Sequence, residues 1–345
     1  MYRLIEYSEN YRSAWNNFLK EHGTIFHSIE WKEILEEAFR YKSRYFLAID
    51  ENNAVVGLVP LFICRNILLR RVGVLTPFAN YLDICCIDGQ AYSFIIDELT
   101  RIRGDLKLDY VEIRLKDQSI DEGEVFLDDS NYTFIIPLEG GEDVVFSSFS
   151  GNNRNHIRKA LKNGWFSASL HENDLEGFYN VRRSVLKRLG SPLEDIAFFK
   201  AIRNRLGAKT KILTVTDNET GKVIGGMFLF LSGETVYYQW GGCYDGYNKK
   251  YVNNFMYWEA IKYAINSGYK YLDMGRSPVN SGTFRFKEQW GAQCTGLKYL
   301  RIGKNRGNEA GINHSKLKPV VGVWKVLPQF VTDFAGKRLI KYVIP

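Results

Sequence analysis

The sequence has few cysteines, the residues that form disulfide bonds and many zinc sites. Its 345 residues include only five cysteines, an odd number, and no two of them form a C-x-x-C pair. Cys85 and Cys86 lie in the apolar run Leu82–Ile87, which is typical of a buried strand. Disulfide scaffolds and zinc sites need cysteines at characteristic spacings. This cysteine usage therefore argues against both, favours a reducing compartment and predicts no metal site.

Several catalytic motifs are also missing. No G-x-G-x-x-G follows a strand-like run and no Walker lysine motif occurs, which argues against NAD and P-loop enzymes. Neither G-x-S-x-G nor H-E-x-x-H is present, and the five histidines are scattered, so a serine or zinc hydrolase has little support. Chemistry without a protein nucleophile fits better, namely direct attack of a substrate amine on an activated acyl group.

Long apolar runs are absent as well. No segment has the roughly 20 consecutive apolar residues that a spanning helix needs, and the first ten residues lack the basic-then-apolar pattern of a signal peptide. We therefore expect a cytoplasmic protein, and peripheral contact with the inner membrane stays open. Proline is scarce, at 8 residues, which argues against long disordered tracts.

Aromatic and basic residues are plentiful. The 21 tyrosines and 22 phenylalanines predict many buried or groove-lining rings. A formal net charge of +7 favours anionic partners, such as phosphates, nucleotide-linked substrates, nucleic acid or an anionic membrane surface, without choosing among them. At about 150 residues per domain, the length predicts two domains.

One pattern occurs twice at the scale of a domain. Apolar runs at 46–50 and 54–63 flank a polar turn and indicate a β-hairpin, and runs at 212–217 and 222–231 repeat it. In each hairpin a glycine, Gly57 or Gly225, indicates a bulge or a close backbone approach.

Each half then continues with a helix-like stretch that ends at a glycine and a strand-like run. The helix-like stretches are 97–104 and 258–268, and the strands are 110–114 and 271–275. Such elements are common in any α/β protein, but their repeated order predicts a duplicated mixed α/β fold. We expect domains at 1–150 and 151–303, followed by a linker and tail at 304–345.

A Ser/Asn/Gly cluster at 147–153 marks the predicted boundary. The basic segment 154–164 follows it and predicts a helix that Asn152 or Asn153 caps and Gly164 ends.

Three cations of this helix, Arg154, Arg158 and Lys162, fall on one face. The row could hold the phosphates of a nucleotide-linked substrate or of an RNA donor. An ordinary solvated helix face explains it equally well.

The last forty residues mix aromatic and basic side chains. Trp324, Phe330 and Phe334 stand beside four cations, Lys325, Lys337, Arg338 and Lys341. This composition suits an interfacial amphipathic segment. Packing of the tail as helices on the domains is the alternative, and we favour it slightly.

An aromatic strand at 237–240 enters a glycine-rich polar loop and then a helix. Gly241 and Gly242 lie in this stretch, and Asn253 or Asn254 is expected to cap the helix. Free amides at a helix start bind anions, so the segment could bind a pyrophosphate or a carbonyl of the donor. An ordinary loop with an ordinary cap is the alternative.

The stretch 269–291 is the most informative. A β-like run ends in a polar turn with Asp273 and Arg276, and a second aromatic-basic segment, expected as a strand, carries Arg285 and Lys287. Charged residues beyond a strand end, beside glycines, are typical of α/β active sites. Lys287 is a candidate oxyanion stabiliser and Asp273 a candidate orienter or base. Each also has a structural explanation, because such residues are common at strands and turns.

These residues resemble a known family. The runs Tyr-Leu-Asp-Met-Gly-Arg and Ser-Gly-Thr-Phe-Arg-Phe-Lys-Glu-Gln-Trp-Gly-Ala, at 271–276 and 281–292, resemble the Fem-type (FemAB-like) members of the GNAT acyltransferase superfamily. The runs 27–31 and 76–83 resemble that family's first domain, and the tail around Trp324 resembles members encoded with bacterial exopolysaccharide systems. The resemblance covers nearly the whole chain.

The resemblance implies two tandem GNAT-like domains and transfer of an acyl or aminoacyl group. The donor would be acyl-CoA or aminoacyl-tRNA, with no bound cofactor, and the acceptor an amine of a nucleotide- or lipid-linked saccharide or peptide precursor of the cell envelope or of an exopolysaccharide. The family's motif lysine falls on Lys287, with Asp273 and Arg276 beside it. The acceptor side is expected to include Trp31, Asn80, Tyr81, Arg154, Arg158, Tyr238 and Arg285.

Two departures from the family pattern concern the donor. No long heptad run indicates the coiled-coil arm of many peptidoglycan-bridge enzymes, and 248–253 lacks the glycines of the usual acyl-CoA loop. The rival hypothesis from another class is a catalytically silent GNAT-like module that binds an anionic glycan or RNA. Its ligand would lie on a basic surface made of Arg154, Arg158, Lys162, Arg182 and Arg183.

Overall fold

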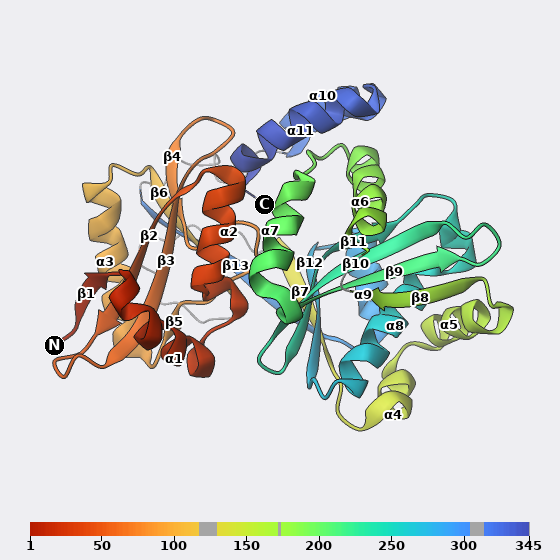
Figure 1. Cartoon of the computed structure of the whole chain (residues 1–345), viewed down its shortest axis with the longest axis horizontal. Coiled ribbons are helices and arrows are strands. Elements are labelled where there is room, and N and C mark those ends of the chain that lie inside the picture. Colours follow the sequence, from red (N-terminus) through yellow and green to blue (C-terminus); the bar gives the residue numbers. More distant parts are fainter. Residues whose placement is uncertain (117–129, 172–173, 304–313, 345) are drawn as a thin grey trace. The chain divides into compact units, whose positions relative to one another are not determined.

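The computed structural model describes residues 1–116, 130–171, 174–303 and 314–344. Contacts divide the chain into two compact units (Figure 1). The first comprises Met1–Asp129, Gly296–Leu317 and Lys337–Pro345, and the second comprises Ser130–Thr295 and Lys318–Gly336. Each unit combines a mixed sheet with helices, as the sequence predicts.

The sheet of the first unit has the strand order β1-β2-β3-β4-β6-β13. Neighbours are antiparallel except β4 and β6, which are parallel, and the short strand β5 pairs with β3. The strands are β1 Arg3–Glu6, β2 Lys42–Ile49, β3 Val55–Arg65, β4 Arg71–Val74, β5 Cys85–Cys86, β6 Tyr110–Lys116 and β13 Gln293–Gly303.

Three α-helices accompany this sheet: α1 Arg12–His22, α2 Ile29–Phe39 and α3 Gly89–Asp105. The Ser28 hydroxyl caps α2 by accepting from the backbone N–H of Trp31, and the Asp88 carboxylate caps α3 in the same way. Such caps satisfy amide groups that a helix start leaves unpaired. The expected end of α3 at Gly104 is one residue early, because the helix runs to Asp105.

The sheet of the second unit has the strand order β8-β9-β10-β11-β12-β7, again antiparallel except for one parallel pair, β11 and β12. The strands are β7 Asn131–Pro137, β8 Phe166–His171, β9 Thr210–Asp217, β10 Val223–Ser232, β11 Thr235–Cys243 and β12 Tyr271–Pro278. The helices are α4 Gly141–Ser148, α5 Gly151–Asn163, α6 Leu175–Leu189, α7 Ile196–Leu206, α8 Val252–Asn266 and α9 Gly282–Lys287.

Helices cover both faces of the second sheet (Figure 1). Two successive glycines of β10 establish this, because successive residues of a strand point to opposite faces. A Cβ on Gly225 would meet Met256 of α8, whereas a Cβ on Gly226 would meet Phe178 of α6. The core of the unit therefore has two layers, one under α8 and one under α6 and α7.

The two units repeat one topology, and both predicted hairpins, β2–β3 and β9–β10, are confirmed. Both predicted bulges are confirmed too. The pairing of β2 with β3 shifts register next to Gly57, and that of β9 with β10 shifts next to Gly225. A Cβ on Gly57 would lie 3.1 Å from the Cys85 carbonyl oxygen, so the backbones approach closely there.

The last strand of each sheet comes from a distant part of the sequence, directly after a strand of the other unit. Strand β7 follows β6 in the chain but pairs with β12, and β13 follows β12 but pairs with β6. The contact units consequently divide at Ser130 and Gly296. Units of contact and units of sequence duplication need not coincide, so the domain boundaries near 150 and 303 stay a prediction.

Three local expectations are wrong. Helix α5 begins at Gly151 and is capped by Ser150, whose hydroxyl accepts from the Asn153 N–H, rather than by either asparagine. Helix α8 begins at Val252, after Tyr251, two or three residues earlier than expected, so Asn253 and Asn254 lie inside its first turn. The segment expected as a strand before Lys287 is helix α9. The Ser150 side chain therefore caps α5, and α8 starts after Tyr251 without a side-chain cap.

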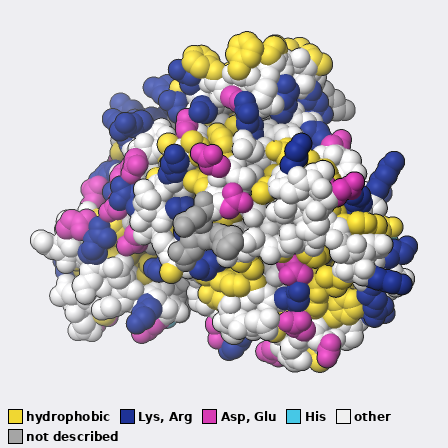
Figure 2. All heavy atoms as spheres, turned by 45° about the vertical axis from the view of Figure 1, so that its right-hand side comes forward, with side chains coloured by type: hydrophobic (Ala, Val, Ile, Leu, Met, Phe, Trp, Pro, Cys, Tyr) yellow, Lys and Arg dark blue, Asp and Glu magenta, His cyan; other side chains and the backbone are white. Residues whose placement is uncertain are grey.

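The tail forms two helices, α10 His314–Val326 and α11 Gln329–Val343. Within the second unit, Arg183 pairs with Asp333 and Lys187 donates to the Leu327 carbonyl at 2.5 Å. The expected packing of the tail as helices is confirmed. Its outer surface is apolar, as Figure 2 shows, and the exposed side chains include Val320, Val323, Val326, Phe330 and Phe334.

Among the helices of the described residues, none is both long enough and apolar enough to cross a membrane.

Candidate active site

The two parallel strands of the second unit separate soon after they meet. Strands β11 and β12 pair only from Thr235 to Tyr237 and from Tyr271 to Asp273. Beyond this point β11 continues against β10 and β12 continues against β7. Backbone groups that face the other strand are thus not used in pairing β11 with β12, which is where a sheet can accept a ligand.

A bulge on β12 begins where the strands separate. Two residues, Met274 and Gly275, are accommodated between the pairs Asp273–Ile135 and Arg276–Thr133. Gly275 has φ +74°, a conformation that glycine adopts readily and other residues rarely do. The Asp273 carboxylate, which is buried, accepts hydrogen bonds from the Gly275 N–H and from the Thr133 hydroxyl, both at 2.7 Å. Asp273 therefore fixes the bulge, which gives it a structural role.

The bulge binds the amine of Lys287. The Lys287 Nζ donates to the Gly275 carbonyl at 2.6 Å and to the Arg276 carbonyl at 3.2 Å. The side chain is only 4% exposed, although it carries an amine. Asp273, Arg276 and Lys287, the three predicted catalytic residues, are therefore brought together by one bulge and one short helix.

Burial lowers the pKa of Lys287 to about 7, an effect that Asp273 opposes and Arg276 reinforces. A buried ammonium loses the solvation that water gives it. Two N–H groups point at carbonyl oxygens, so the tetrahedral nitrogen has one remaining position. That position holds a third N–H donor below pH 7 and a lone pair above it. The geometry suits a group that donates to a developing negative charge.

The helical form of 282–287 changes the expectation for Arg285. In a strand, residues two apart share a face, but in a helix they differ by about 200°. Lys287 is buried and Arg285 is exposed, as the helix requires. The Ser281 hydroxyl caps the helix by accepting from the Phe284 N–H at 3.1 Å. A serine followed by two apolar rings in the Ser-Gly-Thr-Phe-Arg-Phe-Lys run was the available signal for a capped helix.

Aromatic rings join the lysine helix to the strands. Tyr257 of α8 contacts Tyr238 of β11, Phe286 of α9 and Trp290, with ring centroids 5.3, 5.3 and 5.4 Å apart. Desolvation raises the pKa of Tyr238 to about 12, so its phenol is neutral at physiological pH. Tyr238 is thus linked through Tyr257 to Phe286, the residue before Lys287, and its expected role as an acceptor contact stays a prediction.

The predicted donor residues fall into two pairs. Gly241 and Gly242 lie on β11 after it leaves β12, and a Cβ on Gly241 would lie 2.4 Å from the Gly226 carbonyl oxygen, so the site needs glycine. Asn253 and Asn254 lie in the first turn of α8, whose start has no side-chain cap. The Asn254 amide is buried and donates to Asn153, and the partly exposed Asn253 amide donates to Asn248 at 3.0 Å.

The first-unit residues of the predicted acceptor side differ in exposure. Trp31 is fully buried and its indole donates to the Thr76 hydroxyl at 2.9 Å. Its side chain therefore has a structural role in the core of the first unit. Asn80 and Tyr81 are half-buried in the segment between β4 and β5, and the Lys116 ammonium lies 5.6 Å from the Tyr81 ring centroid.

Helix α5 presents part of the predicted basic row. Arg158 and Lys162 line a hollow of about 260 Å³ together with Lys159 and His156. Arg154 is absent from this lining and donates to the Ser147 carbonyl. No acidic side chain lines this hollow, so its cations give it a positive field.

Arg182 and Arg183 do not extend this basic surface, contrary to the expectation for the silent module. Arg182 forms a buried, two-point ion pair with Glu194, at 2.5 and 2.9 Å. Arg183 pairs with Asp333 of the tail. Both guanidinium groups therefore have structural partners.

Two residues of the site were missed from the sequence. Thr133 lies on β7, well before the predicted second domain, and a pairing between distant strands leaves no local signal. Gly275 carries the carbonyl that holds Lys287, and a glycine inside a strand-like run was a usable signal for a bulge.

Comparisons with known proteins agree with this architecture. The family described as acetyltransferase (GNAT) domain matches residues 147–288, which include Lys287. The lipid II:glycine glycyltransferase of Staphylococcus epidermidis is 21% identical, over 79% of this chain and 86% of that protein. The enzyme of the same name from Staphylococcus haemolyticus is 20% identical, over 46% of this chain and 55% of that protein.

Solved structures share the fold. FemX superposes with a TM-score of 0.66 at 15% identity, covering 88% of this chain and 98% of FemX. L-PGS from Bacillus licheniformis gives 0.56 at 15% identity, covering 94% and 97%. A tandem GNAT protein from the clavulanic acid biosynthesis pathway gives 0.56 at 7% identity, covering 88% and 99%. Residues 147–288 thus match the acetyltransferase (GNAT) domain, and the whole chain, with its repeated topology, is similar to FemX, to the glycyltransferases and to tandem GNAT proteins.

Proposed function

We propose that the protein transfers an aminoacyl group from aminoacyl-tRNA to an amine of a lipid-linked cell-envelope precursor. The observation that carries the proposal is the buried Lys287, whose amine is held by two carbonyls of the β12 bulge. The names of the curated relatives, lipid II:glycine glycyltransferase, support the acceptor class. An exopolysaccharide precursor is the alternative acceptor.

The proposed reaction needs no covalent enzyme intermediate. The acceptor nitrogen attacks the ester carbonyl of the donor, and the carbonyl oxygen becomes an oxyanion. The third N–H of Lys287 donates to this oxygen, and collapse expels the ribose hydroxyl of the tRNA, which takes up the proton that the amine loses. A buried donor stabilises such a charge strongly because little water screens it.

Two features support binding of an anionic donor in the second unit. The uncapped first turn of α8 offers backbone N–H groups, and the hollow on α5 is lined by Arg158, Lys159 and Lys162. Binding of RNA by such cations weakens steeply with salt. Acyl-CoA is the alternative donor, and its phosphates would use the same groups.

The tail supports a position at a membrane surface. Its exposed apolar side chains include Val320, Val323, Val326, Phe330 and Phe334, and cations such as Lys325 and Lys337 interrupt them. This composition suits peripheral contact with anionic lipid, where a lipid-linked acceptor resides.

A transfer assay tests the proposal. Purified protein is mixed with tRNAs, each charged with one labelled amino acid, and with lipid-linked or nucleotide-linked peptide precursor, and labelled product is separated. We expect product from aminoacyl-tRNA and little from acetyl-CoA. The Lys287→Met variant, with the far-UV spectrum and Tm of the folded protein, is expected to lose transfer by at least ~100-fold, the scale of one oxyanion donor.

The other outcomes are equally informative. Product from acyl-CoA alone would replace the proposed donor, and transfer only to an exopolysaccharide amine would replace the acceptor. Saturable RNA binding with no product from any donor would favour the silent module.

A further inference from the structure

The first unit contains a second basic hollow that the proposed reaction does not use. It has a volume of about 440 Å³ and is lined at the ends of α2, β2, β3, β4 and α11. Five cations line it and no acidic residue does: Arg40, Lys42, Arg65, Arg71 and Lys341. Within the described part of the chain, Arg40, Lys42 and Arg71 have no ion-pair partner. The field in this hollow therefore attracts an anion.

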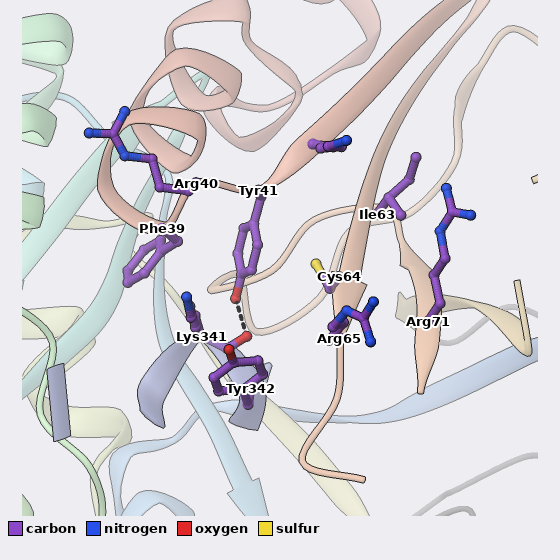
Figure 3. A pocket seen from close by; sticks show the side chains of 10 residues that line it. Phe39, Arg40, Tyr41, Ile63, Cys64, Arg65, Arg71, Lys341 and Tyr342 are labelled. Atoms are coloured by element: carbon purple, nitrogen blue, oxygen red, sulfur yellow. Dashed lines mark hydrogen bonds between the residues drawn. The ribbon is translucent and has the colours of Figure 1, made fainter. Parts of the chain in front are cut away.

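Defined side-chain positions and a hydrogen bond form the walls of the hollow. Figure 3 shows Arg65 and Arg71 on one side and Lys341 near Phe39 on the other, with Tyr41 between them. The Tyr41 hydroxyl donates to the Lys341 carbonyl at 2.7 Å, and this hydrogen bond connects α11 to the segment between α2 and β2. Burial raises the pKa of Tyr41 well above its ordinary value. The Tyr41 hydroxyl therefore stays neutral and does not cancel the positive charge of the cations around it.

Arg40 occupies a backbone position that glycine would fill with less strain. It ends α2 in the left-handed region, with φ +57°. Helices usually end on glycine in this conformation because a Cβ is disfavoured there. The exposed Arg40 side chain contributes nothing to the core, so its charge is the property that this position offers.

An apolar tip stands directly beside two of these cations. Ile67, Leu68 and Leu69 lie between Arg65 and Arg71 at the end of the β3–β4 hairpin, and Leu68 and Leu69 are 57% and 61% exposed. The Arg65 guanidinium donates to the Leu69 carbonyl at 3.3 Å, which joins the tip to the hollow.

The tip is a formed structure. The Asn66 side-chain oxygen accepts from the N–H groups of Leu68 and Arg70, at 3.0 and 3.1 Å, and the Leu69 N–H donates to the Asn66 carbonyl at 2.8 Å. The hydrogen bonds hold three consecutive large apolar side chains in solvent. Exposed apolar groups between cations are the arrangement that peripheral proteins use at an anionic bilayer.

We propose that this hairpin tip inserts into the interfacial region of an anionic membrane, with the basic hollow binding the phosphate of a lipid headgroup. The membrane, rather than a soluble phosphate, is the occupant because only a lipid offers an apolar phase for Ile67–Leu69 next to a phosphate for Arg65 and Arg71. The proposal goes beyond the transfer reaction and does not require it, since binding needs neither donor nor acceptor.

Vesicle flotation tests the proposal with the full-length protein. Vesicles of phosphatidylcholine alone are compared with vesicles containing phosphatidylglycerol, and inorganic pyrophosphate binding is measured separately by calorimetry. We expect flotation only with the anionic vesicles, and a loss of at least fivefold in Arg65→Gln/Arg71→Gln. The charge-matched control is Lys20→Gln/Lys209→Gln, two exposed cations elsewhere, which should float like the unchanged protein.

Two further variants separate binding from folding. Leu68→Ser should lose flotation while keeping pyrophosphate binding. Arg40→Gly should keep or raise the Tm while weakening vesicle binding, because it relieves the backbone and removes the charge. Lys287→Met should float normally, which separates this proposal from the proposed reaction.

The proposal is overturned if pyrophosphate binds in the hollow but anionic vesicles do not. It is also overturned if Leu68→Ser and Arg65→Gln/Arg71→Gln float as the unchanged protein does, since the tail would then carry the contact alone.

Discussion

At the scale of the residue, one lysine decides the chemistry of the site. The Lys287 amine is buried and donates to two carbonyls of a strand bulge. Its environment costs free energy whenever the amine is charged, because burial removes hydration. Functional sites often carry such locally unfavourable groups.

The first prediction concerns pH and stability. The folded pKa of Lys287, about 7, lies below the ordinary value of 10.5, so the unfolded chain binds more protons between these values. This residue's contribution to the free energy of unfolding should therefore rise with pH above 7, by up to ~1.4 kcal/mol per unit. Urea unfolding of the unchanged protein and Lys287→Met between pH 7 and 9 measures the difference. Parallel stability curves would contradict the lowered pKa.

The second prediction concerns the bulge glycine. Gly275→Ala should lose about 1–2 kcal/mol of stability, because alanine is strained at positive φ, and should also lose transfer, because the carbonyl that holds Lys287 moves. Gly268→Ala is the matched control, since Gly268 has φ +79° and open space around it. We expect equal loss of stability there, measured by urea unfolding, with full transfer. Equal transfer activity of the two variants would contradict the prediction, because it would show that transfer does not depend on the geometry of the bulge.

At the scale of the element, the six-residue helix α9 carries the lysine and depends on its cap. Short helices gain little from their own hydrogen bonds, so the Ser281 cap and the packing of Phe284 against Phe134, with ring centroids 5.0 Å apart, hold it in place.

The third prediction follows from this dependence. Ser281→Ala should lose about 1 kcal/mol of stability and part of the transfer activity, measured by thermal unfolding and by the transfer assay. Ser281→Asp should retain both, because aspartate caps helices as well as serine does. Loss of activity in Ser281→Asp equal to that in Ser281→Ala would show that the hydroxyl acts other than as a cap.

The elements also show what a sequence can reveal. Both hairpins and their glycine bulges were predictable, because alternating apolar runs and strand glycines are local signals. Helix α9 was not recognised, because its last four residues, Phe284–Lys287, alternate aromatic and basic side chains as an edge strand would. The composition of the tail predicted its helices. It did not predict their contacts with Arg183 and Lys187, because partners far apart in sequence leave no local pattern.

The same limit applies to the candidate site. Lys287, Asp273 and Arg276 could be grouped because they lie within one short stretch. Thr133 could not be added to them, because only the pairing of β7 with β12 brings it to Asp273.

At the scale of the whole molecule, the tail contributes to both units. Lys318–Gly336 belongs to the second unit, where Thr332 is buried, and Lys337–Pro345 belongs to the first unit, where Ile340 is buried. In the first unit Arg114 also donates to the Ile344 carbonyl at 2.9 Å.

The fourth prediction is that a chain ending at Gly303 is less stable than the full chain. Removing α10 and α11 exposes apolar surface and leaves Arg183 and the buried Arg114 with fewer partners, so the apparent Tm should fall by more than ~5 °C. Calorimetry measures it. Phe330→Ser, on the exposed face, is the control and should unfold like the full chain. An unchanged Tm after truncation would mean that the tail packs only weakly.

The measurement that tests the central claim most directly is single-turnover transfer by the unchanged protein and Lys287→Met as a function of pH. If the charged amine stabilises the oxyanion, the unchanged protein should show a limb of the rate that descends as pH rises through about 7, and the variant should be slower by at least ~100-fold with no such limb. A variant that transfers at the unchanged rate, with the same pH profile, would contradict the assignment of Lys287 to the reaction.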